Sequence, residues 1–149
     1  MTDLLTTALH SLPHGPEFRF LDRLVSLEPG KSGVGEYKVR GDEPFLPGHF
    51  PGQALFPGVL LLEAAAQLAG TVAQSDPALK RISDLKLTAL RAVKFLGTAK
   101  PGQVIRLEAR ITARMANLVN AVATASVDDQ LVMQAELILS GDSGKYQIL

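Results

Sequence analysis

One histidine and one glutamate stand out in a stretch of the sequence that is otherwise apolar. Residues 44–70, PFLPGHFPGQALFPGVLLLEAAAQLAG, place His49 among three Pro-Gly pairs and Glu63 inside a run of aliphatic residues. A carboxylate in such a helix is unfavourable by several kcal/mol unless it is paired, hydrated or protonated. A histidine and a carboxylate that share an apolar cleft form an acid–base pair. The pattern therefore predicts proton transfer by His49 and Glu63.

Each of these two residues also has a purely structural interpretation. Glu63 could lie on an exposed stripe of its helix or be satisfied by a neighbouring donor, and His49 could be a core histidine that hydrogen-bonds to the backbone. Two neighbours favour the catalytic interpretation. Gln67 lies four residues after Glu63 and shares its helix face. Gly58 begins the helix, where unpaired N–H groups can hold a carbonyl oxygen that gains negative charge.

The helix that carries Glu63 is expected to form the buried centre of the fold. Pro57 is suited to its first position, because the N–H that proline lacks would be unpaired there anyway. Residues 58–74 are apolar on nearly every face. A helix of this kind has to be surrounded by other elements rather than laid on a surface.

The surrounding strands are predicted from the alternation of apolar and polar residues. Residues 103–114 alternate with a period of two, and residues 118–127 repeat the pattern. A further strand is expected within residues 82–95, where the mixed pattern leaves its limits undefined. After a turn at residues 128–129, a third alternating strand places five apolar side chains on one face, namely Leu131, Met133, Ala135, Leu137 and Leu139.

The N-terminal third predicts a short helix and a hairpin. Asp3 can cap a helix that runs to about residue 10. Residues 18–27 and 34–40 suit two strands, and residues 28–33 between them have turn chemistry. Together these elements predict an α+β fold in a single domain over residues 1–149, with one long apolar helix clasped by a mostly antiparallel sheet.

The composition excludes several functional classes. Lys and Arg together number 15, as do Asp and Glu, so the whole chain has no strong attraction to nucleic acid or to an anionic membrane. The absence of cysteine excludes disulfides and thiolate nucleophiles. No signal-peptide pattern is present, and the apolar run 59–73 is shorter than the roughly 20 residues that cross a bilayer, so a cytoplasmic location is expected. The histidines match no metal-ligand spacing, so neither a metal nor a cofactor is expected.

Residues 48–67, GHFPGQALFPGVLLLEAAAQ, resemble the signature of the 3-hydroxyacyl-[acyl-carrier-protein] dehydratases of fatty acid synthesis. The match includes the histidine, the Phe-Pro-Gly after it, the second Pro-Gly, the glutamate and the glutamine at the family's spacing. The resemblance extends over roughly residues 12–141. Its further motifs are LPH (12–14), DR (22–23), EPGK (28–31), EPF (43–45), VKF (93–95) and PG (101–102).

The resemblance implies a hotdog fold, in which a curved antiparallel sheet wraps a long central helix, and a dehydration reaction. By resemblance, His49 takes a proton from C2 of a (3R)-3-hydroxyacyl thioester and Glu63 acts on the C3 hydroxyl, which leaves as water. The product is the trans-2-enoyl thioester. The backbone N–H of Gly58 is implied to bind the thioester carbonyl, and Phe50 and Gln67 are expected to bind substrate. A related dehydratase that also isomerises its product carries Asp at the helix acid, so Glu63 indicates the non-isomerising type.

The resemblance also implies partners. An acyl carrier protein delivers the substrate, and the histidine and the acid of one site come from the two subunits of a homodimer, which can assemble into a trimer of dimers. Acyl carrier proteins are acidic, and residues 76–114 contain nine basic residues against three acidic ones, which suits such a partner.

Alternatives to this enzyme remain. A hotdog thioesterase would use the helix acid to activate water, although such thioesterases generally lack the histidine of the GHFPG motif. A non-catalytic hotdog protein would only bind acyl chains. The sequence also departs from the family at residues 15–18, where GPEF replaces Arg-Tyr-Pro-Phe, and at Asp42, residues 96–99 and Gln103. These departures leave the preferred acyl length open. They also leave open whether the pathway is fatty acid synthesis or a related lipid or polyketide synthesis.

Overall fold

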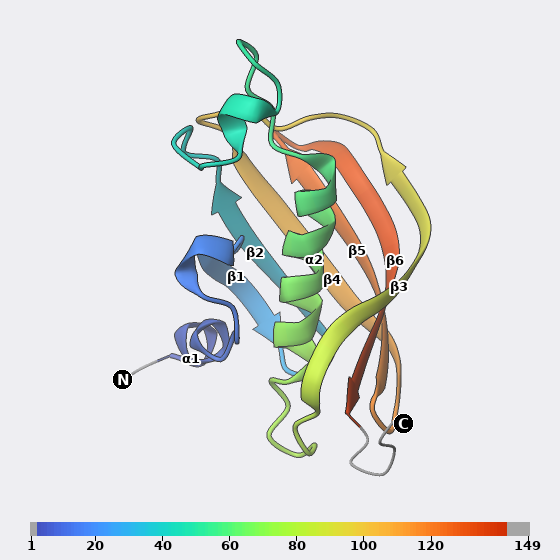
Figure 1. The fold of residues 1–149 in the computed structure, drawn as a ribbon. Helices are drawn as coiled ribbons and strands as arrows, with labels where there is room; N and C mark the ends of the chain where they lie inside the picture. Colours follow the sequence, from blue (N-terminus) through green and yellow to red (C-terminus); the bar gives the residue numbers. More distant parts are fainter. Residues whose placement is uncertain (1–2, 143–149) are drawn as a thin grey trace.

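The computed structural model describes residues 3–142, and it shows one antiparallel sheet wrapped around a long helix (Figure 1). The six strands follow the order β1-β2-β4-β5-β6-β3, and every neighbouring pair is antiparallel. This is the predicted α+β arrangement, the hotdog fold. The expected domain limits, 1–149, include residues 1–2 and 143–149, which lie outside the described residues. The elements are α1 (Leu4–His10), η1 (Pro16–Phe18), β1 (Arg23–Glu28), β2 (Ser32–Lys38), η2 (Leu46–Gly48), α2 (Gly58–Ala73), β3 (Ser83–Phe95), β4 (Val104–Met115), β5 (Leu118–Val127) and β6 (Gln130–Asp142).

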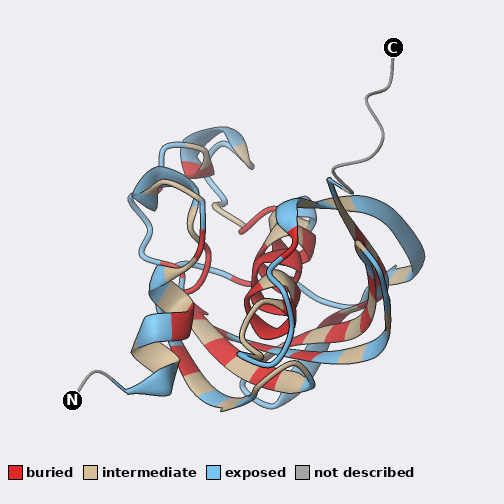
Figure 2. Cartoon of the chain, turned by 90° about the horizontal axis from the view of Figure 1, so that it is seen from below, coloured by how far each residue is buried: buried red, intermediate tan, exposed pale blue. Residues whose placement is uncertain are grey.

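Helix α2 is the buried centre of the molecule, as its composition predicts. Pro57, expected at the first helical position, is instead the N-cap, so the helix begins one residue later, at Gly58, and ends at Ala73. Eleven of its 16 residues are buried, and Figure 2 shows the helix inside the curve of the sheet, whose inner face is also buried. Among residues 3–142, no helix combines the length and the apolar character needed to span a membrane.

Small side chains on the inner face of the sheet let α2 pack closely. The inner face of β5 carries Ala121, Ala123 and Ala125, all buried. On β2, a Cβ added to Gly33 would lie 2.8 Å from Cγ2 of Val72, a fully buried residue of the helix. Real Cβ atoms essentially never approach so closely, so Gly33 sets the distance between helix and sheet.

Replacing Gly33 with alanine is therefore expected to destabilise the protein. Val72 is branched at Cβ and enclosed, so it cannot swing away from the added methyl group. We expect a loss of about 1–3 kcal/mol in the free energy of unfolding, measured by urea denaturation. The matched control is Gly48→Ala, because nothing lies within 4 Å of a Cβ added there. Equal stability of the two variants would contradict this account of the helix–sheet contact.

The N-terminal predictions are partly confirmed. Helix α1 is capped as expected, and Oδ1 of Asp3 accepts a hydrogen bond from the Thr6 N–H at 2.7 Å. The first strand, expected over residues 18–27, begins only at Arg23, so residues 18–22 were assigned wrongly. Phe18 ends the short helix η1, and the backbone of Phe18 and Phe20 bonds to the Gln67 side chain of α2. A bond to a neighbouring strand appears at Asp22, whose N–H donates to the Glu36 carbonyl at 2.7 Å. The second strand, expected over 34–40, lies at 32–38 because the turn is tighter than predicted and uses Gly30 at φ 75°.

The three C-terminal strands match their predicted positions within a few residues, with one exception among their inward side chains. Leu131 was expected to face the core with Met133, Ala135, Leu137 and Leu139, but it is exposed. The pairing of β5 with β6 shifts between Ala125 and Ser126, so that Leu131 and Met133 oppose adjacent residues. This bulge turns Leu131 outward and buries Val132 instead.

Strand β3 forms one edge of the sheet, and in the described part of the chain it pairs on one side only, with β6. None of its residues is fully buried. Its pairing shifts register three times, and Asp84 and Ala92 have positive φ. These irregularities break the period of two, which is why the sequence left the limits of this strand undefined.

Candidate active site

The segment that connects β2 to α2 lies beyond the N-terminal end of the helix (Figure 1). His49 belongs to this segment. It follows the short helix η2, and its N–H donates to the carbonyl of Leu46 at 3.0 Å. Its carbonyl accepts a hydrogen bond from the Leu55 N–H at 2.8 Å. The imidazole Nδ1 lies 3.1 Å from the carbonyl oxygen of Leu55.

The contact with Leu55 determines which nitrogen of His49 can act as a base. A carbonyl oxygen can only accept, so this hydrogen bond places the ring proton on Nδ1 and leaves the lone pair on Nε2. The Phe50 ring stacks on the imidazole, with centroids 4.3 Å apart and planes at 25°, and Phe50 itself is 53% exposed. The half-buried ring of His49 is thus held in one orientation, as a general base requires.

Glu63 lies half-buried on α2, one turn before the buried Gln67. Nε2 of Gln67 donates to Oε2 of Glu63 at 3.2 Å and to the Phe18 carbonyl at 2.8 Å. Oε1 of Gln67 accepts from the Phe20 N–H at 2.9 Å. Gln67 therefore joins Glu63 to the extended segment before β1. Its hydrogen bond fixes one oxygen of the carboxyl group, and the binding of substrate by Gln67 stays a prediction.

A cavity of about 680 Å³ lies beside Glu63. Its wall includes Gly70 of α2, Leu85 and Leu87 of β3, and His14 from the N-terminal segment. This volume lies within the range of small-molecule sites. Glu63, the one acidic residue of helix α2, thus borders a partly apolar cavity.

The structure does not bring His49 and Glu63 together within one chain. His49 is absent from the wall of the cavity, and no contact between the two residues is found among residues 3–142. His14 occupies the position next to Glu63, with Nε2 3.6 Å from Oε2.

Gly58 is the first residue of α2, where backbone N–H groups have no partner within the helix. A Cβ added to it would lie 3.1 Å from two ring carbons of Phe95 on β3. Any larger residue would displace this ring, so glycine keeps the helix start close to β3. Its N–H group is one of those without a partner inside the helix, and the binding of a thioester oxygen by this N–H stays a prediction.

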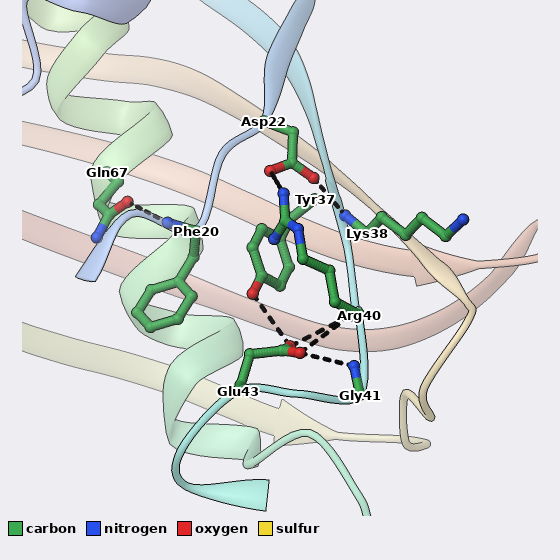
Figure 3. Close-up of polar contacts among 8 residues, drawn as sticks. All are labelled: Phe20, Asp22, Tyr37, Lys38, Arg40, Gly41, Glu43 and Gln67. Carbon is green, nitrogen blue, oxygen red and sulfur yellow. Dashed lines mark hydrogen bonds and ion pairs between the residues drawn. The ribbon is translucent and has the colours of Figure 1, made fainter. Parts of the chain in front are cut away.

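A buried polar cluster fixes the start of the segment that carries His49 (Figure 3). The carboxylate of Glu43 accepts hydrogen bonds from the Tyr37 hydroxyl at 3.1 Å and from the N–H groups of Arg40 at 3.0 Å and Gly41 at 2.7 Å. Arg40 also pairs with Asp22 at 2.5 Å, and this hydrogen bond raises its pKa. These bonds replace the strand ladder where β2 ends.

Burial and the neighbouring Glu43 carboxylate raise the pKa of Tyr37 to about 12 from 10.0. Because the pKa is higher in the folded state, the contribution of Tyr37 to stability is complete below pH 10 and is lost as the pH rises towards 12.

Tyr37→Phe should therefore lower the free energy of unfolding by about 1–2 kcal/mol at neutral pH, because Glu43 loses one donor. Denaturation of both proteins across the alkaline range should show this difference shrinking above pH 10. A difference that stays constant up to pH 12 would show that the Tyr37 proton is not held more tightly in the folded state.

Comparison with known proteins identifies the family of this chain. A family model described as the FabA-like domain matches residues 12–136. The chain belongs to the FabA-like family. It is 39% identical over 130 residues to the 3-hydroxyacyl-[acyl-carrier-protein] dehydratase FabZ of Chloroflexus aggregans, over 87% of this chain and 89% of that protein. The corresponding enzyme of Syntrophotalea carbinolica is 36% identical, over 92% and 93% of the two chains.

Solved structures show that the hotdog fold is shared more widely than this family's sequence pattern. The dehydratase heterocomplex ApeI:P of Xenorhabdus doucetiae matches the FabA-like chain with a TM-score of 0.75 at 17% identity, over 88% of both chains. A hypothetical thioesterase with coenzyme A from Streptococcus pneumoniae matches with a TM-score of 0.61 at 15% identity, over 80% of this chain and 84% of that one. At these identities the likeness establishes the fold alone.

Sequence reasoning assigned no role to two features of the site. His14 belongs to the LPH motif of the resemblance and Glu43 to the EPF motif. Membership in these motifs was the sequence feature that could have pointed to a role for either residue. Their partners, Glu63 and Tyr37, belong to other elements, so no local spacing predicts the contacts. Within residues 3–142, no group of three or more His, Cys, Asp or Glu side chains could hold a metal ion.

Proposed function

We propose that this chain removes water from (3R)-3-hydroxyacyl thioesters on acyl carrier protein and releases trans-2-enoyl thioesters, in fatty acid or a related lipid or polyketide biosynthesis. The observation that carries the proposal is the hydrogen bond between Nδ1 of His49 and the Leu55 carbonyl, which leaves Nε2 as a base. Relatives named as 3-hydroxyacyl-[acyl-carrier-protein] dehydratases support it over most of the chain. Glu63, the one acid of α2, supplies the second group.

The proposed reaction moves two protons. Nε2 of His49 takes a proton from C2, and the electrons of that bond form the C2=C3 double bond. The C3 hydroxyl leaves as water with a proton from Glu63. The N–H of Gly58 holds the thioester oxygen while negative charge builds on it. The products leave His49 protonated and Glu63 as a carboxylate, and solvent returns both groups to their starting states.

We further propose that the active unit is a homodimer in which each subunit is a single hotdog domain. In each of its sites, His49 and Glu63 come from different subunits. Strand β3 supports this arrangement, since its outer edge has no partner strand within residues 3–142 and long unpaired edges invite pairing with another chain. Three apolar residues in the second half of β3 or directly after it are also exposed: Leu90 at 40%, Phe95 at 50% and Leu96 at 55%. The cavity beside Glu63 borders the same strand.

The test is the reaction itself. The purified protein is incubated with a (3R)-3-hydroxybutyryl acyl carrier protein, and the carrier is weighed by mass spectrometry. We expect the carrier to lose the mass of one water with its thioester intact. Loss of the whole acyl group would instead identify a thioesterase. An unchanged carrier at every acyl length tested would favour a protein that only binds acyl chains.

A further inference from the structure

His14 lies against the proposed acid but has no part in the reaction as described. Its Nε2 is 3.6 Å from Oε2 of Glu63, and the two side chains are 31% and 27% exposed. We propose that His14 is a positioning residue that holds the Glu63 carboxyl group and stabilises the charge it gains as it protonates the leaving hydroxyl. This inference rests on the proposed function.

The surroundings of the ring indicate which nitrogen carries its proton. Nδ1 of His14 is buried and has no hydrogen-bond partner within the described part of the chain. A buried N–H without a partner is rare in folded proteins. The neutral ring therefore carries its proton on Nε2, the nitrogen that faces Glu63. His14 thus directs a donor at the carboxyl group, whereas the Nε2 of His49 is left as an acceptor.

Phe18 contacts the ring of His14, and Arg19 holds the backbone around it. Phe18 stacks on it, with ring centroids 6.3 Å apart and planes at 27°. Nε of Arg19 donates to the backbone carbonyl of His14 at 2.7 Å, and Nη2 of the same side chain donates to the Leu12 carbonyl at 3.1 Å. The segment around His14 is therefore fixed before substrate arrives, which is the requirement for a preorganised donor.

Two donors converge on the same oxygen of Glu63. Oε2 accepts from Gln67 at 3.2 Å and faces Nε2 of His14. With Oε2 engaged in this way, Oε1 is the oxygen that gives its proton to the C3 hydroxyl. The carboxylate left behind is stabilised through Oε2. A separation of 3.6 Å is longer than a hydrogen bond, but catalytic contacts often tighten only when substrate is bound.

Two substitutions separate this role from simple packing. His14→Phe keeps a ring that can stack on Phe18 but removes the donor. His14→Gln removes the ring but can place an amide donor near the position of Nε2. We expect kcat for His14→Phe to fall about tenfold or more with KM little changed, because one donor to the developing charge is lost. We expect kcat for His14→Gln to stay near that of the unmodified protein.

The assay follows the enoyl thioester formed from a 3-hydroxybutyryl carrier protein, with thermal unfolding of each variant measured alongside. His10→Phe is the matched control, since His10 is exposed on α1 and lies outside the Glu63 cavity. The inference is overturned if His14→Phe keeps the unmodified kcat, or if His14→Gln falls as far as His14→Phe. If the unmodified protein forms no enoyl thioester, the proposed function fails rather than the role of His14 within it.

Discussion

Replacing His49 with alanine should slow dehydration by about 10²–10⁴-fold, the usual contribution of a general base. The side chain is the proposed acceptor of the C2 proton, and its orientation depends on the Leu55 carbonyl. Since the proton moves only during the reaction, we expect kcat and kcat/KM to fall together while substrate still binds. The measurement is the rate of enoyl thioester formation on carrier protein.

His10→Ala provides the matched control for this substitution, because it removes an exposed histidine from α1. Thermal unfolding of the His49→Ala protein separates lost chemistry from lost structure, since the substitution also removes one loop hydrogen bond, worth about 1 kcal/mol. If the His49→Ala protein kept more than about a tenth of the activity, well above the expected range, His49 would not be the base.

Replacing Glu63 with glutamine is expected to have an effect of similar size, about 10²–10⁴-fold on kcat. The amide occupies the same volume and can still accept the hydrogen bond from Gln67. It cannot release a proton to the leaving hydroxyl, so the C3–O bond breaks without assistance. The measurements are the rate of elimination and the dissociation constant of the hydroxyacyl carrier protein. We expect the rate to fall and the dissociation constant to stay the same.

Glu28→Gln is the control for this charge change, because Glu28 is an exposed surface residue that pairs only with Lys31 among the described residues, at 3.4 Å. Surface ion pairs of this kind contribute little to stability. The role of Glu63 would be refuted by a glutamine variant that eliminates water as fast as the Glu28→Gln protein.

Regular alternation accounts for the parts of the fold that could be predicted from the sequence. Strand β5 runs over the predicted residues, because every second side chain enters the core. Prediction failed where a bulge or a side-chain partner replaces the ladder. Leu131 faces out because of a register shift in β6. The residues from Phe18 to Asp22 look like a strand, yet Gln67, 49 positions after Phe18, takes part of their backbone hydrogen bonding.

The candidate site, like the fold, could be predicted from the sequence only in part. His49 and Glu63 could be proposed because their residue types are out of place in an apolar segment. Gly58 and Gln67 followed from their positions on the helix, and the family motif added Phe50. The bond from His49 to the Leu55 carbonyl could not be predicted, because it depends on how the segment between β2 and α2 folds back on itself. The contact of His14 with Glu63 joins positions 49 residues apart. No local periodicity encodes such a contact.

The central claim is that His49 of one subunit and Glu63 of the other act together. Its most direct test is a mixed dimer, made by co-expressing His49→Ala and Glu63→Gln chains with different tags and purified through both. One of its two sites would be intact, so we predict about half of the activity of a doubly tagged unmodified dimer. A mixed dimer as inactive as either parent, beside an active unmodified dimer, would contradict the claim.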